Sequence, residues 1–351
     1  MNEFQTLCET FGLDAETIPE SFRRHYEASK ETGRGKRIER STIEKALAFY
    51  DLTETDYQAA CFACAERING DEALKELFDL LSYVLNDVAG DDCYRDMTKL
   101  KKQTKRLFAQ PGLASFPYLM LLNEVDHHQS KMKELDFDEE QIKRHIRGVH
   151  NSCLKQGLLT WGALFTNVRI LSVGRLQYEI LSWEKDYSIY INSETNEVKT
   201  EKESDSDRLA CQKGDYYITI HIPASGKFDA ESVQASIRDS REQILKYFKG
   251  KIPVPFIYAC YSWMISPDLR DILNPESNLI KFLDLFRVVE RKANVSGFLT
   301  FVFKAADCKD YSTLPEDSSL QRALKKYLVE GRPLHQGVGV VKPTGDYCKF
   351  E

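Results

Sequence analysis

The spacing of apolar residues predicts helices over the first 150 residues of the chain. In "DEALKELFDLLSYVL" the apolar side chains recur with the i, i+3, i+4, i+7 spacing of one helix face. The stretches "STIEKALAFYDL" and "ETDYQAACFACAERI" show the same spacing, and each contains an early Ser, Thr or Asp that can cap a helix N-terminus. We therefore expect residues 1–150 to form an all-helical domain.

After about residue 157 the apolar residues alternate with a period of two, which is typical of half-buried strands. In "RLQYEIL" every second residue is apolar, and Gly174 allows the preceding run "NVRILSV" to turn back as a hairpin partner. "YYITIHIP" alternates in the same way, with isoleucines on one face and His221 on the other. Further strands are expected in "YSIYI", "PFIYACYSW", "RVVERKA" and "GFLTFVFKA".

Helices are expected between these strands. One begins at Asp229, a second covers about 277–286, and a third lies in "SSLQRALKKYL", where Ser318 and Gln321 have the spacing of a capping box. The polar stretch "NSETNEVKTEKESDSDRLACQKGD" is expected to be a long, mobile connection. Strands mixed with helices, and hairpins at both ends, predict an α+β fold. We expect the all-helical domain to be followed, at 151–351, by a mixed β-sheet flanked by helices.

The distribution of charge along the chain argues against a nucleic-acid partner. The 351-residue chain has a formal charge of −6; residues 1–150 carry a balance of −7 and residues 151–351 a balance of +1. Neither part has the basic excess that nucleic-acid binding requires, so a nucleic-acid-binding helical domain with a regulatory sheet is disfavoured. A local basic cluster is interpreted as a solvated helix face, with an acidic partner or a coenzyme phosphate as the alternative; it comprises Lys99, Lys101, Lys102, Lys105 and Arg106.

The cysteines and the hydropathy pattern predict a cytoplasmic protein that does not enter a membrane. The nine cysteines form no disulfide framework, the chain does not begin with a signal-peptide pattern, and no apolar run approaches the roughly 20 residues of a membrane span. Cys61 and Cys64 are expected to be core thiols, and the adjacent His127 and His128 make a poor chelate. No metal site is therefore expected.

Several local strings identify a family resemblance. "GRLQYEI", "IHIPASGKF", "CYSWMISPDLRDILNPESNLIKFLDLF" and "SLQRALKKYLVEG" resemble the GNAT-like C-terminal domain of putative N-acyltransferases, which follows a helical N-terminal domain. The resemblance implies that acetyl-CoA or another acyl-CoA binds as co-substrate where two central parallel strands splay apart. It implies a small-molecule amine or a peptide amine as acceptor, and it leaves a homodimer open.

The resemblance also assigns cofactor-binding residues. The loop that holds the coenzyme pyrophosphate falls on "IPASGK", so it implies Ile222, Ala224, Ser225, Gly226 and Lys227, with Asn278 on a later helix. Only Gly226 represents the expected glycines. An ordinary strand–helix turn is about equally supported, because carboxylates at Asp229 and Glu231 already satisfy the helix dipole.

Two residues are candidates for the catalytic base. His221 lies opposite the isoleucines of its strand, and neutral imidazole accepts protons near neutral pH. Glu179 lies on the polar side of its strand, where the resemblance implies a base. The alternatives are a structural histidine under a helix and a carboxylate that is exposed or paired with Arg175.

The expected proton donor is missing. The position that the resemblance assigns to a tyrosine is Leu285, and Tyr258 or Tyr261 on the preceding strand are the replacements. The sequence therefore predicts an acyl-CoA-dependent N-acyltransferase. The alternative is a catalytically inactive GNAT-like module that binds a ligand or a protein, favoured by the incomplete glycine loop and the absent tyrosine.

Overall fold

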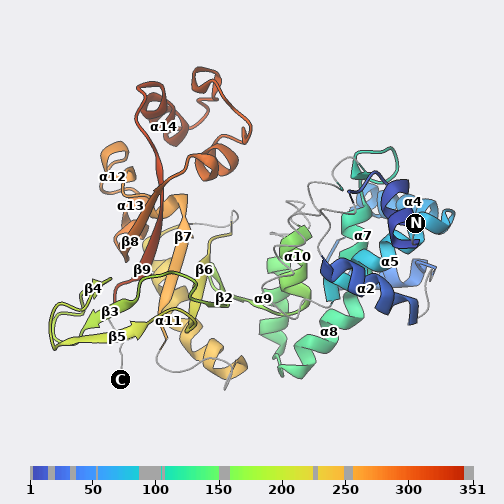
Figure 1. Ribbon diagram of the computed structural model, residues 1–351, viewed down its shortest axis with the longest axis horizontal. Helices are drawn as coiled ribbons and strands as arrows, with labels where there is room; N and C mark the ends of the chain where they lie inside the picture. The colour runs from blue at the N-terminus through green and yellow to red at the C-terminus, as the bar shows by residue number, and fades with distance from the viewer. Residues whose placement is uncertain are drawn as a thin grey trace. The chain divides into compact units, whose positions relative to one another are not determined.

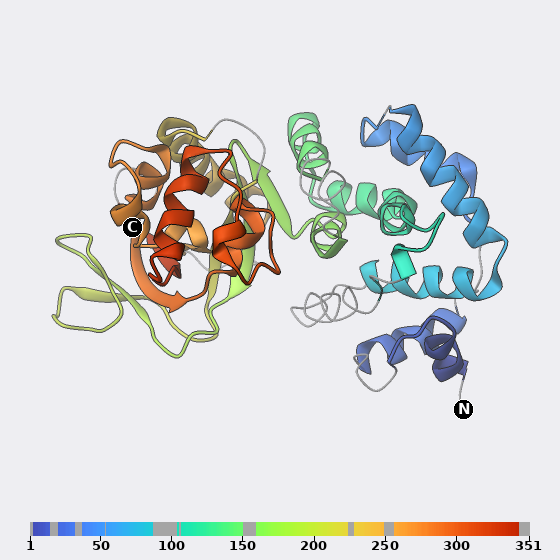
Figure 2. The ribbon, with the colours of Figure 1, turned by 90° about the horizontal axis from the view of Figure 1, so that it is seen from above.

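The chain folds as two compact units, Met1–Ile170 and Leu171–Glu351. The computed structural model describes residues 3–14, 20–31, 37–52, 54–86, 104, 107–149, 159–223, 228–248 and 256–343. Figures 1 and 2 show helices throughout the first unit and a sheet with flanking helices in the second. The α+β fold class expected from the sequence is confirmed. The domain boundary at residue 150 stays a prediction, because residues 150–158 lie outside the described ranges.

The described secondary structure of the first unit consists mainly of helices. These are α1 (Glu3–Thr10), α2 (Glu20–Glu31), α3 (Arg40–Phe49), α4 (Thr55–Asn69), α5 (Glu72–Asn86), α7 (Phe116–Asn123), α8 (Val125–Glu134), α9 (Glu139–Val149) and α10 (Leu159–Thr166). The apolar stripe predicted for "DEALKELFDLLSYVL" is the face of α5 that enters the core, where Leu74, Leu77, Phe78 and Leu81 are buried. The predicted basic cluster lies outside the described residues.

The two cysteines of the C-x-x-C pair are core residues, as expected. Cys61 and Cys64 lie one turn apart on α4 and are buried. Burial raises the pKa of Cys61 to about 11 and that of Cys64 to about 12. Both groups are therefore neutral thiols at physiological pH, a state that neither binds metal ions nor attacks electrophiles readily.

A buried histidine pair lies in the core of the first unit. His128 on α8 and His145 on α9 have no solvent exposure, and their ring centroids are 4.9 Å apart. The hydroxyl of Tyr50 lies 2.7 Å from Nδ1 of His128, and Nε2 of His145 lies 3.0 Å from the carbonyl oxygen of Phe165. Burial lowers the pKa of His145 to about 4 and lowers that of His128 well below its usual value. Both rings are therefore neutral in the folded protein.

The second unit is built on a six-stranded sheet. Its strands are β1 (Ile170–Val173), β2 (Leu176–Ser182), β6 (Tyr216–His221), β7 (Tyr258–Ser262), β8 (Phe286–Ala293) and β9 (His335–Val341), in the order β1-β2-β6-β7-β9-β8. β6 and β7 pair in parallel, whereas the β2–β6, β7–β9 and β8–β9 pairs are antiparallel. Figure 1 shows β2, β6, β7 and β9 side by side. The mixed sheet agrees with the prediction.

Helix α11 (Ala230–Tyr247) covers one face of this sheet. The hydroxyl of Tyr178 on β2 lies 2.8 Å from Oγ of Ser236, and Tyr258 on β7 lies 3.0 Å from Oγ of Ser240. The predicted cap is present, since the Asp229 carboxylate accepts a hydrogen bond from the backbone N–H of Ser232. The other helices of the second unit are α12 (Leu269–Ile272), α13 (Asn278–Leu283) and α14 (Ser319–Val329), with short turns η2 (Trp263–Ile265) and η4 (Tyr311–Thr313).

A second, three-stranded sheet packs on the opposite face. Its order is β4-β3-β5, from β3 (Ile189–Asn192), β4 (Val198–Lys199) and β5 (Asp207–Cys211). Apolar residues of this sheet and of β7 and β9 share one buried cluster, which includes Ile189, Ile191, Val198, Ala259, Val338 and Val340. The three-stranded sheet therefore covers the face of the six-stranded sheet that lies opposite α11.

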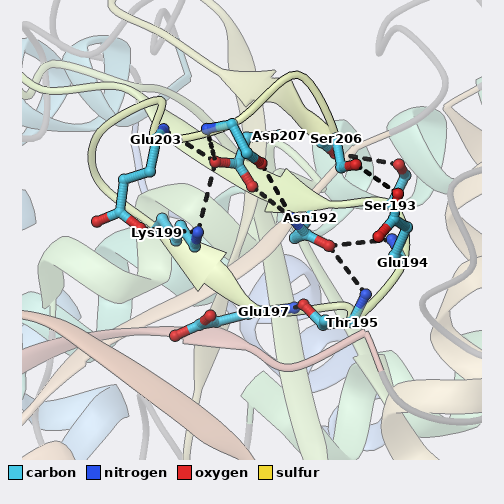
Figure 3. A network of polar contacts seen from close by, with 10 residues as sticks. Asn192, Ser193, Glu194, Thr195, Glu197, Lys199, Glu203, Ser206 and Asp207 are labelled. Atoms are coloured by element: carbon cyan, nitrogen blue, oxygen red, sulfur yellow. Dashed lines mark hydrogen bonds and ion pairs between the residues drawn. The ribbon is translucent and has the colours of Figure 1, made fainter.

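The prediction of a mobile connection after β3 is wrong, because a polar network orders this segment (Figure 3). The buried Asp207 carboxylate accepts hydrogen bonds from Nδ2 of Asn192 at 2.7 Å and from the backbone N–H groups of Glu203 and Ser204. These hydrogen bonds outweigh burial and lower the pKa of Asp207. Oδ1 of Asn192 accepts from the backbone of Glu194 and Thr195 in turn. The polar side chains of this segment therefore hold its turns in place by hydrogen bonds to the backbone.

Two further differences concern the end of the chain. The predicted strand "GFLTFVFKA" contains a π-helix, η3 (Phe298–Val302), while the strand that closes the sheet is β9, which the sequence analysis did not predict. β9 contains Gly337 and Gly339, and η2 folds closely over both of them. A Cβ atom at Gly337 would overlap the backbone oxygen of Ile265, and one at Gly339 would lie 2.8 Å from Cγ2 of Ile265. The glycines therefore permit the turn after β7 to pack on β9.

We expect Gly337→Ala to destabilise the second unit by about 1–3 kcal/mol, because the overlapping atom belongs to the backbone and cannot rotate away. The measurement is the thermal unfolding midpoint of the full chain. Gly70→Ala is the control, since a Cβ there meets only ordinary contacts of 3.4 and 3.7 Å with backbone oxygens. An equal effect of the two substitutions would contradict the close approach of η2.

We expect the first unit to lose stability as the pH falls through the window from about 6.5 to about 4. Folding lowers the pKa of His145 within this window, so the unfolded chain binds more protons than the folded one. The loss reaches at most about 3 kcal/mol for this residue. Hydrogen exchange of peptides from α8 and α9 measures it.

In the same experiment, His145→Gln should flatten the pH dependence, whereas His127→Gln should leave it unchanged. His127 is a suitable control because it is only partly buried and its Nε2 lies 3.1 Å from Oδ1 of Asn167. Retention of the full pH dependence in His145→Gln would show that other groups cause it.

Candidate active site

The parallel pairing of β6 and β7 ends in the middle of both strands. The paired residues are Ile218 with Tyr258 and Thr219 with Ala259. Beyond them β6 continues to His221 while it pairs with β2, and β7 continues to Ser262 while it pairs with β9. Beyond Thr219 and Ala259, β6 therefore remains paired with β2 and β7 with β9, but β6 and β7 are no longer paired with each other. The sheet opens at its centre.

Glu179 and His221 form a hydrogen-bonded pair beside this opening. Glu179 on β2 faces Thr219 on β6, so His221 is its diagonal neighbour on the same side of the sheet. Nε2 of His221 lies 3.0 Å from Oε2 of Glu179. The glutamate side chain is 6% exposed and the histidine side chain 22%. The structure thus joins two residues that the sequence analysis treated as separate candidates, and it buries Glu179 rather than exposing it.

Tyr261 lies at the level of His221 on the other side of the opening. Because Thr219 faces Ala259, the residues two positions further along the parallel strands, His221 and Tyr261, are at equivalent heights on the same face. Tyr261 is 55% exposed. Tyr258, the other tyrosine considered from sequence, is buried on the opposite face against α11. Of these two tyrosines, Tyr261 is the one that solvent and ligands reach.

A segment after β2 reaches the same face. Nζ of Lys185 lies 2.7 Å from Oε2 of Glu290 on β8, and the hydroxyl of Tyr187 donates to the same oxygen. Burial alone would raise the pKa of Glu290, but the hydrogen bonds from Lys185 and Tyr187 more than offset it and lower the pKa. The Lys185 ammonium lies 6.0 Å from the ring centroid of Tyr261. This ion pair brings a positive charge close to the opening.

The predicted cofactor-binding residues are only partly described. Ile222 directly follows the last residue of β6 and is half-buried, whereas Ala224, Ser225, Gly226 and Lys227 lie outside the described residues. Asn278 is the exposed first residue of α13. α13 approaches the start of α11, where the rings of Phe282 and Phe228 are 5.2 Å apart. No described contact joins Asn278 to the Glu179–His221 pair.

Within the described ranges, no group of three or more His, Cys, Asp or Glu side chains could hold a metal ion. None of the helices described is long and apolar enough to cross a membrane.

Residues 170–341 match the family model of the GNAT-like C-terminal domain. The chain carries a GNAT-like domain. This range begins at β1 and ends at the last residue of β9, so it coincides with the six-stranded sheet and its insertions. The resemblance stated from the strings of the sequence is confirmed. Among curated proteins, none matches the chain significantly.

Solved structures resemble the whole chain, including its helical unit. An acyltransferase in complex with decanoyl-CoA matches with a TM-score of 0.67 and 16% identity over 96% of this chain and 98% of the other. The complex with decanoyl-CoA and teicoplanin gives a TM-score of 0.68 and 18% identity, and a mutant with octanoyl-CoA gives 0.69 and 19%, both with the same coverage. At these identities the likeness establishes a common fold.

Sequence reasoning missed the contact between Glu179 and His221. The residues are 42 positions apart, and their contact depends on β2 pairing with β6 across the inserted three-stranded sheet. The only signal was that each lies on the polar side of its strand. The knowledge that these two strands are neighbours would have been sufficient to place them together.

Proposed function

We propose that the protein transfers an acyl group from an acyl-CoA to an amine. The observation that carries this proposal is the parallel ladder that stops at Thr219 and Ala259 while both strands continue. An open ladder at the centre of a sheet exposes backbone N–H and C=O groups that seek hydrogen-bond partners. The amide groups of a pantetheine arm can form hydrogen bonds with these backbone groups, as an added strand does.

His221 acts as the base in this proposal, and Glu179 orients it. An ionised Glu179 accepts the hydrogen of Nε2, so Nδ1 of the imidazole takes the proton from the attacking nitrogen. The neutral amine attacks the thioester carbonyl carbon and its N–H proton passes to His221. The C–S bond then breaks, and the amide and the thiolate of CoA leave.

Tyr261 is proposed to protonate the thiolate. It occupies the strand on the other side of the opening, is exposed, and lies on the face that carries His221. The phenol O–H donates its proton to sulfur and the tyrosinate regains one from solvent. This assignment replaces the tyrosine that is absent at Leu285.

The relatives support the class of donor and suggest the acceptor. Their structures contain decanoyl-CoA, octanoyl-CoA or CoA, and two of them contain teicoplanin or a 10C-teicoplanin. We therefore propose a medium-chain acyl-CoA rather than acetyl-CoA as the better donor, and an amine on a small molecule or peptide as acceptor. The cysteines of the described residues are free thiols, which supports a reducing cytoplasm as the site of action.

The test measures release of the CoA thiol from acetyl-, octanoyl- and decanoyl-CoA in the presence of a panel of primary amines. His221→Gln should lower kcat about 100-fold or more, the range of general base catalysis. Glu179→Gln should lower it about 10- to 100-fold, because a hydrogen bond to a charged group is lost.

His335→Gln is the matched control for the loss of a carboxylate-paired histidine. His335 is held by Asp268 through a 2.9 Å contact at Nδ1, outside the proposed machinery, and its substitution should leave kcat within about twofold. Calorimetry with the same acyl-CoA panel separates the two functions considered from the sequence. Binding without turnover for every amine tested would favour the inactive binding module. Absence of binding would reject both acyl-CoA as the donor and its proposed place between β6 and β7.

A further inference from the structure

Lys185 lies beside Tyr261 on the face of the sheet that carries the opening, and the reaction steps proposed above do not use it. Its Nζ lies 6.0 Å from the ring centroid of Tyr261. The same ammonium lies 2.7 Å from Oε2 of Glu290, and the hydroxyl of Tyr187 donates a 2.9 Å hydrogen bond to that oxygen. The carboxylate of Glu290 thus holds both Lys185 and Tyr187 next to the proposed proton donor.

The segment that carries Lys185 is anchored on both sides of it. Trp183 is buried, and its indole N–H donates a 2.8 Å hydrogen bond to the carbonyl oxygen of Tyr187. Its ring packs edge-on against the rings of Tyr187 and Tyr217, at centroid distances of 5.7 and 5.2 Å. The backbone N–H of Trp183 donates to the carbonyl oxygen of Asp215 at 2.8 Å. The main chain is therefore held just before and just after Lys185, so its side chain starts from a fixed point.

The ion pair directs its positive end toward Tyr261. Tyr261 on β7 and Glu290 on β8 both face Val338 on β9, the strand between them. They therefore share one row across the sheet, two strand spacings or roughly 10 Å apart. Since the Lys185 ammonium contacts the Glu290 carboxylate and also lies 6.0 Å from the Tyr261 ring, it occupies the interval between the two side chains.

The proposed reaction places a transient negative charge on Tyr261. When the C–S bond breaks, its electron pair stays on sulfur; the phenol proton then passes to sulfur, and the phenolate oxygen keeps the charge until solvent returns a proton. A cation that is already fixed beside the ring stabilises this charge without any rearrangement during the transfer. It stabilises the neutral phenol much less, so its effect falls on the rate and not on binding of the donor.

We propose that Lys185, held by Glu290 and Tyr187, is a positioning residue for the proton donor: its ammonium stabilises the negative charge that forms on Tyr261 when the phenol protonates the CoA thiolate. This inference rests on the proposed function. It assigns to the segment between β2 and β3 a part in the departure of the thiol, separate from proton abstraction by His221 and Glu179.

The test is a double-mutant cycle with octanoyl-CoA and the amine that supports the fastest turnover. Amide formation is followed in a single turnover with the protein in excess, so that product release does not limit the rate. Tyr261→Phe keeps the ring and should lower the rate constant about 100-fold or more. Lys185→Met should lower it about tenfold, with the Kd for octanoyl-CoA within about twofold of the wild type. In the Tyr261→Phe background, Lys185→Met should cause no further loss, because no charge forms there.

Two further variants separate charge from structure. Lys185→Arg keeps a cation at this position and should react within about threefold of the wild type. Lys213→Met is the matched control, since Lys213 also pairs with a carboxylate of this segment, Asp186, but is exposed and outside the proposed machinery. It should leave the rate within about twofold. The thermal unfolding midpoint establishes that each variant is folded, and Lys185→Gln replaces Lys185→Met if the latter is not.

The outcomes distinguish this inference from the proposed function. A wild-type protein that neither binds nor uses octanoyl-CoA rejects the proposed function, and the role of Lys185 with it. If the wild type uses octanoyl-CoA but Lys185→Met reacts at the same rate, only the role of Lys185 is overturned. The same conclusion follows if the losses from Lys185→Met and Tyr261→Phe multiply, or if Lys185→Arg is as slow as Lys185→Met.

Discussion

The structure of the second unit depends on the contact between η2 and the glycines of β9. The chain that follows β7 turns over Gly337 and Gly339 and packs Ile265 against them, and β7 itself stays paired with β9 as far as Ser262. Oγ of Ser262 stabilises this turn by accepting the N–H of Met264. The ladder of β7 with β6 ends at Ala259. Two positions without side chains thus allow η2 to pack on β9, next to the place where the sheet opens.

The register between β2 and β6 then decides which side chains border the opening. If β2 shifted by one residue against β6, Glu179 and His221 would lie on opposite faces of the sheet and could not form their hydrogen bond. The buried isoleucines hold the register, so the same packing that stabilises the sheet also aligns the carboxylate with the imidazole. The buried isoleucines lie on one face of the β2–β6 pair, and Glu179 and His221 lie on the other face.

Much of the fold follows from sequence where one segment carries its own signal. The alternating isoleucines gave β6, Asp229 gave the start of α11, and Ser318 with Gln321 gave the capping box of α14. β9 was missed because its glycines are required by Ile265, which is distant in the sequence, and because glycines weaken the alternation of the strand itself. Both base candidates could be named from sequence, but their contact, and the location of Lys185 beside Tyr261, depend on pairing between distant segments.

The Asp207 network has a consequence for how the chain acquires its structure. Nearly all its hydrogen bonds join residues within the segment 192–207, so the three-stranded sheet has low contact order and little loop entropy to overcome. The large sheet must instead bring β2 to β6 across that segment. A small sheet that forms first would shorten the effective loop between them, so we expect it to speed the pairing of the two strands that carry Glu179 and His221.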